Sequence, residues 1–131
     1  RVALGLDQNR LSMLLAVLHR HGGVHCGDQD VFVNLVGGVK TTETSTDLAG
    51  LAAIVSSLRG VALPQDLVLF GEVGLSGEIR PVPSGQERIQ EALKHGFKRA
   101  IIPYGNKPRQ TIEGMDVVLV KKLSDLLSAL F

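Results

Sequence analysis

Apolar residues recur at helical spacing in four stretches of the chain. In each stretch, apolar side chains three and four positions apart line one face of a helix. The first is delimited by Asp7, a suitable N-cap, and by the Gly22-Gly23 pair that follows its basic last turn. Gly60 ends the second in the same way. The predicted helices cover residues 7–21, 46–59, 84–95 and 122–131.

Short apolar runs between these stretches predict strands, and the most distinctive one leads into a glycine-rich hairpin with its turn near residues 75–77. The return strand, residues 78–82, precedes Ser84 and Glu87, whose spacing predicts a capping box at the start of the third helix. An exposed loop is predicted over residues 103–114 and a polar loop over residues 40–45. The other predicted strands cover residues 31–36, 66–70, 97–102 and 116–120. The order predicts one α+β or α/β domain spanning residues 1–131.

The amino-acid composition narrows the class of protein but does not identify a function. The net charge of +1 gives no overall argument for nucleic acid or a membrane surface, and no apolar run is long enough to span a bilayer. The single cysteine, Cys26, cannot form an internal disulfide, which agrees with a reducing cytosol. The chain begins at Arg1 rather than methionine, so we expect it to be part of a longer protein.

The distribution of charge is more informative than its sum. Residues 28–78 carry a net charge of −5, whereas residues 79–131 carry +4. No acid lies between Glu91 and Glu113, and basic residues accumulate there. This block predicts an anion-binding face, with a solvated basic surface as the alternative. Its members are Lys94, Lys98, Arg99, Lys107 and Arg109.

Metal and nucleotide chemistry find little support in the sequence. His19, His21, His25 and Cys26 lie close together, but no returning pair of ligands follows them, so we interpret them as helix-end and loop residues. No phosphate-binding loop of the form Gly-x-x-x-x-Gly-Lys-Ser/Thr occurs. We therefore expect no metal and no ATP site in this chain.

Ser45 is the candidate nucleophile. It precedes the second predicted helix, where a serine can simply cap the helix. Alternatively, the helix amides could hold an oxyanion while Ser45 attacks a carbonyl. Serine needs a base for this reaction, and a lysine of lowered pKa would be the natural partner because no histidine is suitably placed.

The hairpin resembles the proteolytic domain of Lon proteases, whose corresponding segment reads Gly-Glu-Ile-x-x-x-Gly-x-Val-x-Pro-Ile-Gly-Gly. Here Gly71-Glu72-Val73 and Gly77-Glu78-Ile79-Arg80-Pro81-Val82 match it. The resemblance implies a Lon-type fold (ribosomal protein S5 domain 2-like), with mixed sheets and packed helices. It places the nucleophile at Ser45 and the catalytic lysine at Arg88. Arginine keeps its proton at any relevant pH, so the resemblance predicts a domain without peptidase activity. We expect Arg88 to pair with Glu91 or to bind an anion.

A longer match is similar to the C-terminal domain of the bacterial RadA (Sms) family. It includes Val39-Lys40-Thr41-Thr42-Glu43-Thr44-Ser45, the whole run from Gly71 to Arg88, and Lys122-Leu123-Ser124-Asp125. The resemblance implies a DNA-repair ATPase with a zinc finger and a RecA-like motor upstream, so that zinc, ATP and magnesium belong to the longer protein. It also implies a hexameric ring, branched or single-stranded DNA and a recombinase filament as partners, and a cytoplasmic, nucleoid-associated location.

Three functional interpretations follow from these patterns. The first is a ring-forming, DNA-binding domain in which the acidic half of one subunit faces the basic half of the next, and the five basic residues of the block contact phosphates. The second is a working Ser45 peptidase with another base. The third is a structural scaffold that makes no DNA contact.

Overall fold

The computed structural model describes residues 1–37 and 43–131. Within these ranges the chain forms four α-helices, two short 3-10 helices and seven strands. The helices are α1 (Gln8–Gly22), α2 (Asp47–Arg59), α3 (Gly85–Lys94), α4 (Leu123–Leu130), η1 (Thr44–Thr46) and η2 (Tyr104–Asn106). The strands are β1 (Val2–Leu4), β2 (Phe32–Asn34), β3 (Leu67–Leu69), β4 (Glu72–Val73), β5 (Ile79–Arg80), β6 (Arg99–Pro103) and β7 (Asp116–Val120).

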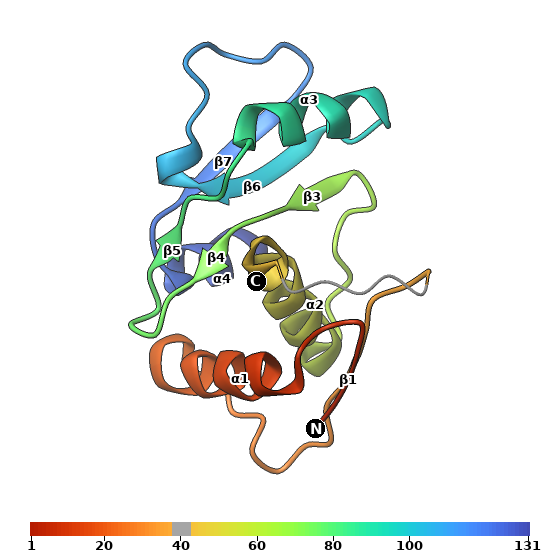
Figure 1. Cartoon of the computed structure of the whole chain (residues 1–131), viewed down its shortest axis with the longest axis vertical. Coiled ribbons are helices and arrows are strands. Elements are labelled where there is room, and N and C mark those ends of the chain that lie inside the picture. Colours follow the sequence, from red (N-terminus) through yellow and green to blue (C-terminus); the bar gives the residue numbers. More distant parts are fainter. Residues whose placement is uncertain (38–42) are drawn as a thin grey trace.

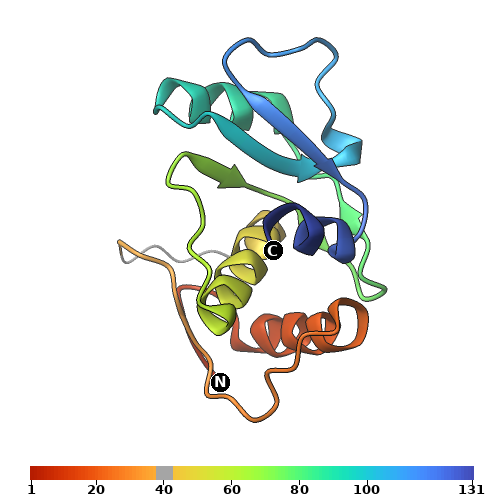
Figure 2. The ribbon, with the colours of Figure 1, turned by 180° about the vertical axis from the view of Figure 1, so that it is seen from behind.

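A parallel sheet with strand order β3-β6-β7 separates two hydrophobic clusters. Successive side chains of β6 point to opposite faces, so Ala100 and Ile102 pack with Ile89 of α3, whereas Ile101 packs with the cluster of α1, α2 and α4. Figures 1 and 2 show α3 on one side of this sheet and α2 and α4 on the other. The mixed α/β architecture agrees with the predicted class.

The first and second helices are confirmed in detail. Asp7 caps α1 by accepting a hydrogen bond from the backbone N–H of Arg10 at 3.2 Å. Gly60 ends α2 in a left-handed conformation. The apolar face predicted for α2 is fully buried at Leu48, Leu51 and Val55. None of the described helices is long and apolar enough to cross a membrane.

The hairpin forms as predicted, with β4 and β5 antiparallel. Its turn faces α1: Gly77 has a φ of +80°, and a Cβ at this position would lie 2.8 Å from His21 Cβ. The chain before α4 holds the other side, because Ile79 N donates to Lys121 O at 2.8 Å and Leu123 N donates to Gly77 O at 2.8 Å. The hairpin therefore joins α1 to the start of α4.

The capping box at Ser84 was a wrong prediction. Ser84 has a φ of 61° and a ψ of 36°, and its side chain makes no capping hydrogen bond to α3. A capping serine needs an extended backbone to direct its hydroxyl at the helix amides, and the left-handed conformation does not provide this.

Other differences concern pairing and burial. The parallel pair β1–β2 was not predicted, and β2 is shorter than the expected strand 31–36. The segment 103–114 is not simply an exposed loop, because Pro103 belongs to β6, η2 follows it, and Ile112 is buried. The polar loop 40–45 falls partly outside the described residues, which resume at Glu43.

Candidate functional site

Ser45 lies in η1, directly before α2, and is buried with 5% of its surface exposed. Its carbonyl accepts a hydrogen bond from Gly71 N at 2.9 Å, and Gly71 O accepts one from Leu48 N at 3.2 Å. These bonds attach the serine segment to the link between β3 and β4. The hairpin and the serine segment, far apart in sequence, are thus held side by side.

Arg88 lies on α3 and extends toward this segment. Its Nη2 donates to Glu43 Oε1 at 2.9 Å, its Nε donates to Pro83 O at 2.9 Å, and its guanidinium lies 5.9 Å from the centre of the Phe70 ring. The structure therefore brings position 88 against the segment that carries Ser45. The expected pairing of Arg88 with Glu91 is wrong, since Arg88 contacts Glu43, and Glu91 contacts Lys94 and His95.

The arrangement cannot transfer a proton through Arg88. A guanidinium stays charged, and here two of its nitrogens already donate to a carboxylate and to a carbonyl. Position 88 consequently holds an ion pair where a catalytic lysine would need to lose its proton.

A buried ion pair beside Ser45 was missed in the sequence. Asp47 is 3% exposed and accepts hydrogen bonds from Arg10 Nε at 3.1 Å, from Arg10 Nη2 and from Val73 N at 3.0 Å. Arg10 Nη2 also donates to Val73 O at 3.3 Å, and its hydrogen bond to Asp47 raises the pKa of Arg10. One carboxylate thus connects α1, the start of α2 and β4.

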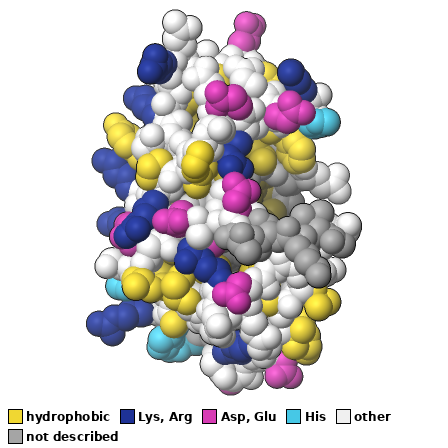
Figure 3. Space-filling model, viewed as in Figure 1, with side chains coloured by type: hydrophobic (Ala, Val, Ile, Leu, Met, Phe, Trp, Pro, Cys, Tyr) yellow, Lys and Arg dark blue, Asp and Glu magenta, His cyan; other side chains and the backbone are white. Residues whose placement is uncertain are grey.

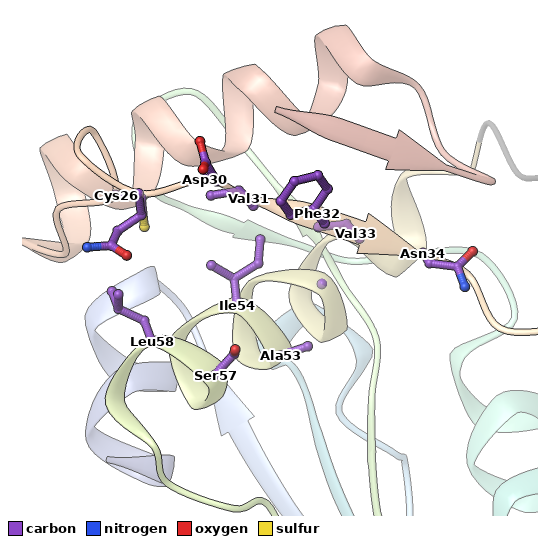
Figure 4. A pocket seen from close by; sticks show the side chains of 12 residues that line it. Cys26, Asp30, Val31, Phe32, Val33, Asn34, Ala53, Ile54, Ser57 and Leu58 are labelled. Atoms are coloured by element: carbon purple, nitrogen blue, oxygen red, sulfur yellow. The ribbon is translucent and has the colours of Figure 1, made fainter.

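Two open cavities lie near these elements. A cavity of about 300 Å³ beside η1 is lined by Asp7, Arg10, Thr44 and Thr46, among others. A second, of about 410 Å³, lies between β2 and α2, and its wall is mixed, with Gln29, Asp30, Asn34 and Ser57 as polar members beside apolar side chains such as Phe32 and Ile54 (Figure 4). Among the described residues, no three His, Cys, Asp or Glu side chains are placed to hold a metal ion.

The structure divides the five predicted basic residues into two groups. Lys94, Lys98 and Arg99 lie around the N-terminal end of β6, whereas Lys107 and Arg109 follow its C-terminal end. These ends are about 13 Å apart for a five-residue strand. Lys94 approaches Glu91 at 4.0 Å and Arg99 pairs with Asp116 at 3.5 Å. The basic block is therefore not one continuous patch.

The second group is larger than the sequence indicated. Lys121, which follows β7, places its Nζ 4.5 Å from the centre of the Tyr104 ring, and Lys107 Nζ lies 6.0 Å from the same centre. Within the part of the chain that the structure describes, Lys107, Arg109 and Lys121 form no ion pair. Figure 3 shows Lys and Arg side chains gathered along the edge of the molecule where Figure 1 places β5 and the segment after β6.

Known proteins resemble this chain over its full length. It is 71% identical over 130 residues to the DNA repair protein RadA of Haemophilus influenzae, covering 99% of this chain and 28% of that protein. It is 73% identical over 128 residues to RadA of Escherichia coli (98% and 28%), and 66% identical over 131 residues to RadA of Pseudomonas aeruginosa (100% and 29%). The chain thus spans less than a third of the length of these relatives.

A family model described as subunit ChlI of Mg-chelatase matches residues 8–106, which include η1, the hairpin, α3 and β6. The matched region contains both Ser45 and Arg88. The chain therefore belongs to this ChlI family.

Proposed function

We propose that this chain is a non-proteolytic, Lon-like, C-terminal domain of a RadA-type DNA-repair ATPase, and that it contributes DNA contacts and contacts between subunits of a ring. The observation that carries the proposal is identity of 66–73% across the whole chain with proteins named DNA repair protein RadA. We follow these relatives rather than the description of the wider family, because their similarity spans every element of the fold.

The absence of peptidase activity is argued from Arg88. Its guanidinium is committed to Glu43 and Pro83, and it cannot serve as the base for Ser45. We expect a serine-directed fluorophosphonate probe to label wild type and Ser45→Ala equally weakly. Labelling of wild type that disappears in Ser45→Ala would support a working peptidase instead.

The ATPase, its magnesium and the zinc site belong, in this proposal, to the longer protein. The relatives are more than three times as long as the segment that this chain matches. The chain itself would act as an accessory domain that binds DNA and neighbouring subunits.

The DNA contact is assigned first to the edge formed by Lys107, Arg109 and Lys121, whose cations are exposed and form no ion pair among the described residues. Lys94, Lys98 and Arg99 form a second candidate group, weakened by the contacts of Lys94 and Arg99 with acids. Each phosphate contact that is lost should reduce the dependence of log K on log salt by about 0.9 for duplex DNA.

The test compares three double variants of the full-length protein in DNA binding between 50 and 200 mM salt. Lys107→Gln/Arg109→Gln should bind more weakly, with a salt slope smaller by about 2. Lys94→Gln/Lys98→Gln should have a smaller effect. Arg20→Gln/Arg59→Gln is the matched control, because both arginines are exposed on α1 and α2. Equal binding by all three variants would contradict the assignment.

Contacts between subunits are supported by two surface features. The acidic residues 28–78 and basic residues 79–131 allow complementary head-to-tail packing. The small β1–β2 sheet also exposes Leu4 by 60% and Phe32 by 74%, which is unusual for side chains of this size. Light scattering of the full-length protein should give the molar mass of a multi-subunit ring, and Phe32→Glu should lower the molar mass of the assembly. A wild-type protein that remains monomeric would contradict this part of the proposal.

A further inference from the structure

Tyr104 is the only tyrosine in the chain, and it lies at the surface rather than in the core. Its side chain is at the start of η2, and 47% of the residue is exposed. The ammonium groups of Lys121 and Lys107 lie 4.5 and 6.0 Å from the ring centre. Two cations from separate segments therefore meet at one exposed aromatic ring.

The backbone beneath the ring is held firmly. The side chain of Asn106 accepts from Val82 N at 2.9 Å and donates to Val82 O at 2.9 Å, so it pairs with that residue as a neighbouring strand would. Gly105 packs closely on Pro81, because a Cβ at position 105 would lie 3.0 Å from Pro81 Cγ. The backbone that carries the ring is thus held in place before any ligand arrives.

The backbones at Lys121 and Lys107 are each held by hydrogen bonds. Asp125 accepts hydrogen bonds from the backbone N–H groups of Lys121 and Lys122 at 3.0 and 3.2 Å, which fixes the chain at the start of α4. Lys107 N donates to Tyr104 O at 3.0 Å, which closes η2. The two backbones are fixed, while the long lysine side chains remain free to move their charges a few ångströms.

Stability does not account for this arrangement. An exposed contact between an ammonium and an aromatic ring is weak, and two lysines near one ring repel each other. An unpaired nucleobase offers a flat π surface to the tyrosine, and the phosphates on either side of it offer partners to the lysines. In a duplex the base faces are stacked and unavailable, so the geometry favours a single strand.

We propose that Tyr104, Lys107 and Lys121 form a stacking platform for one unpaired base of single-stranded DNA, with the ring against the base and the two ammonium groups on its flanking phosphates. The platform rests on the DNA-binding function proposed above and names the nucleic-acid form that this edge binds. Both lysines exchange their contact with the ring for phosphate oxygens when the strand is bound.

The test measures binding of the full-length protein to a 20-nucleotide oligo(dT) strand and to a duplex of the same length, by fluorescence anisotropy. Tyr104→Leu should lose roughly 5- to 150-fold on the single strand, the range found when aromatic stacking partners are removed. It should lose less than twofold on the duplex, and Tyr104→Phe should bind both as wild type does. The matched control is Leu75→Ala, which truncates another exposed apolar side chain, 69% exposed at the hairpin turn, that has no part in the platform or in the proposed subunit contact.

A second measurement does not depend on the stability of the variants. Irradiation of the wild-type complex with oligo(dT) carrying one 5-iodouracil should cross-link the base to the peptide that contains Tyr104. Equal binding of the single strand by Tyr104→Leu and wild type, or cross-linking elsewhere only, would overturn the platform while leaving DNA binding intact. A wild-type protein that binds neither DNA form would overturn the proposed function itself.

Discussion

Replacing Arg10 by methionine should destabilise the fold by about 3 kcal/mol, because it leaves the buried carboxylate of Asp47 without its charged partner. Asp47 is 3% exposed and would keep only the hydrogen bond from Val73 N among those described here. Removing one member of a buried ion pair typically costs about 3–5 kcal/mol. The lower end applies here, since 27% of the Arg10 side chain is exposed and water can partly replace it.

Urea denaturation followed by circular dichroism measures this change in the free energy of unfolding directly, and thermal unfolding gives a second readout. With an unfolding entropy of about 2.1 cal/mol/K per residue, a loss of about 3 kcal/mol in 131 residues lowers the midpoint temperature by about 11 °C. Arg20→Met, on the exposed side of the same helix, is the matched control and should change stability by less than about 0.5 kcal/mol.

The double variant Arg10→Met/Asp47→Leu separates the charge from the packing. It removes both ions together, so it should recover much of the stability lost in Arg10→Met, as apolar replacements of buried pairs commonly do. Equal stability of Arg10→Met and Arg20→Met would contradict a role for Arg10 as the charged partner of buried Asp47. A double variant that lost the full sum of its two single changes would contradict coupling between the two side chains.

Three further changes test other contacts of the site. Arg88→Met should cost less than about 1 kcal/mol in urea denaturation, because its partner Glu43 is 61% exposed and water screens the pair; a cost above about 2 kcal/mol would contradict this. Asn106→Ala should cost about 1–3 kcal/mol, since Val82 N–H and C=O lose their partners, whereas the exposed Asn34→Ala should be nearly neutral. The hydrogen bond from Arg80 lowers the pKa of Glu78 below its ordinary value of 4.5. The ionised Glu78 therefore contributes stability above that pH, and this contribution is lost as the pH falls through the lowered pKa. Glu78→Gln should therefore show a shallower loss of stability in acid than the control Glu113→Gln, and identical acid profiles would contradict the assignment.

Local patterns predicted the elements whose stability is itself local. The apolar spacing of α2 coincides with its buried face, and the Asp7 cap depends only on residues within one turn. The capping box at Ser84 was predicted from its spacing from Glu87, but the spacing does not report the backbone conformation, which is left-handed at Ser84. The β1–β2 pair was missed because three-residue strands carry too few positions to show alternation, and their pairing joins segments about thirty residues apart.

The candidate site shows the same division. The structure brings Arg88 against Glu43, two residues before Ser45. The resemblance did not indicate this partner, because Glu43 and Arg88 are neighbours only in the folded chain. Lys121 was overlooked because it lies outside the acid-free block, and Tyr104 because a lone tyrosine in a predicted loop carries no periodic signal. The Lys121-Lys122 pair before the last helix is visible in the sequence as a basic pair. The contact of Lys121 with the Tyr104 ring is not visible there, because it follows from the parallel pairing of β6 with β7, which places Pro103 opposite Val120.

The two basic sites differ in the contacts that a phosphate would have to displace, and this difference bears on where the proposed DNA contact would form. At position 88 the guanidinium already has a carboxylate, a carbonyl and an aromatic ring, so a phosphate there would have to displace an existing ion pair. At Tyr104 the ammonium groups hold only a weak contact with the ring, so a phosphate would displace almost nothing. The serine segment and the proposed binding edge are therefore physically separate: Arg88 and Asp47 hold the serine segment in place, while η2 and the start of α4 present lysine charge at the surface that is unpaired among the described residues.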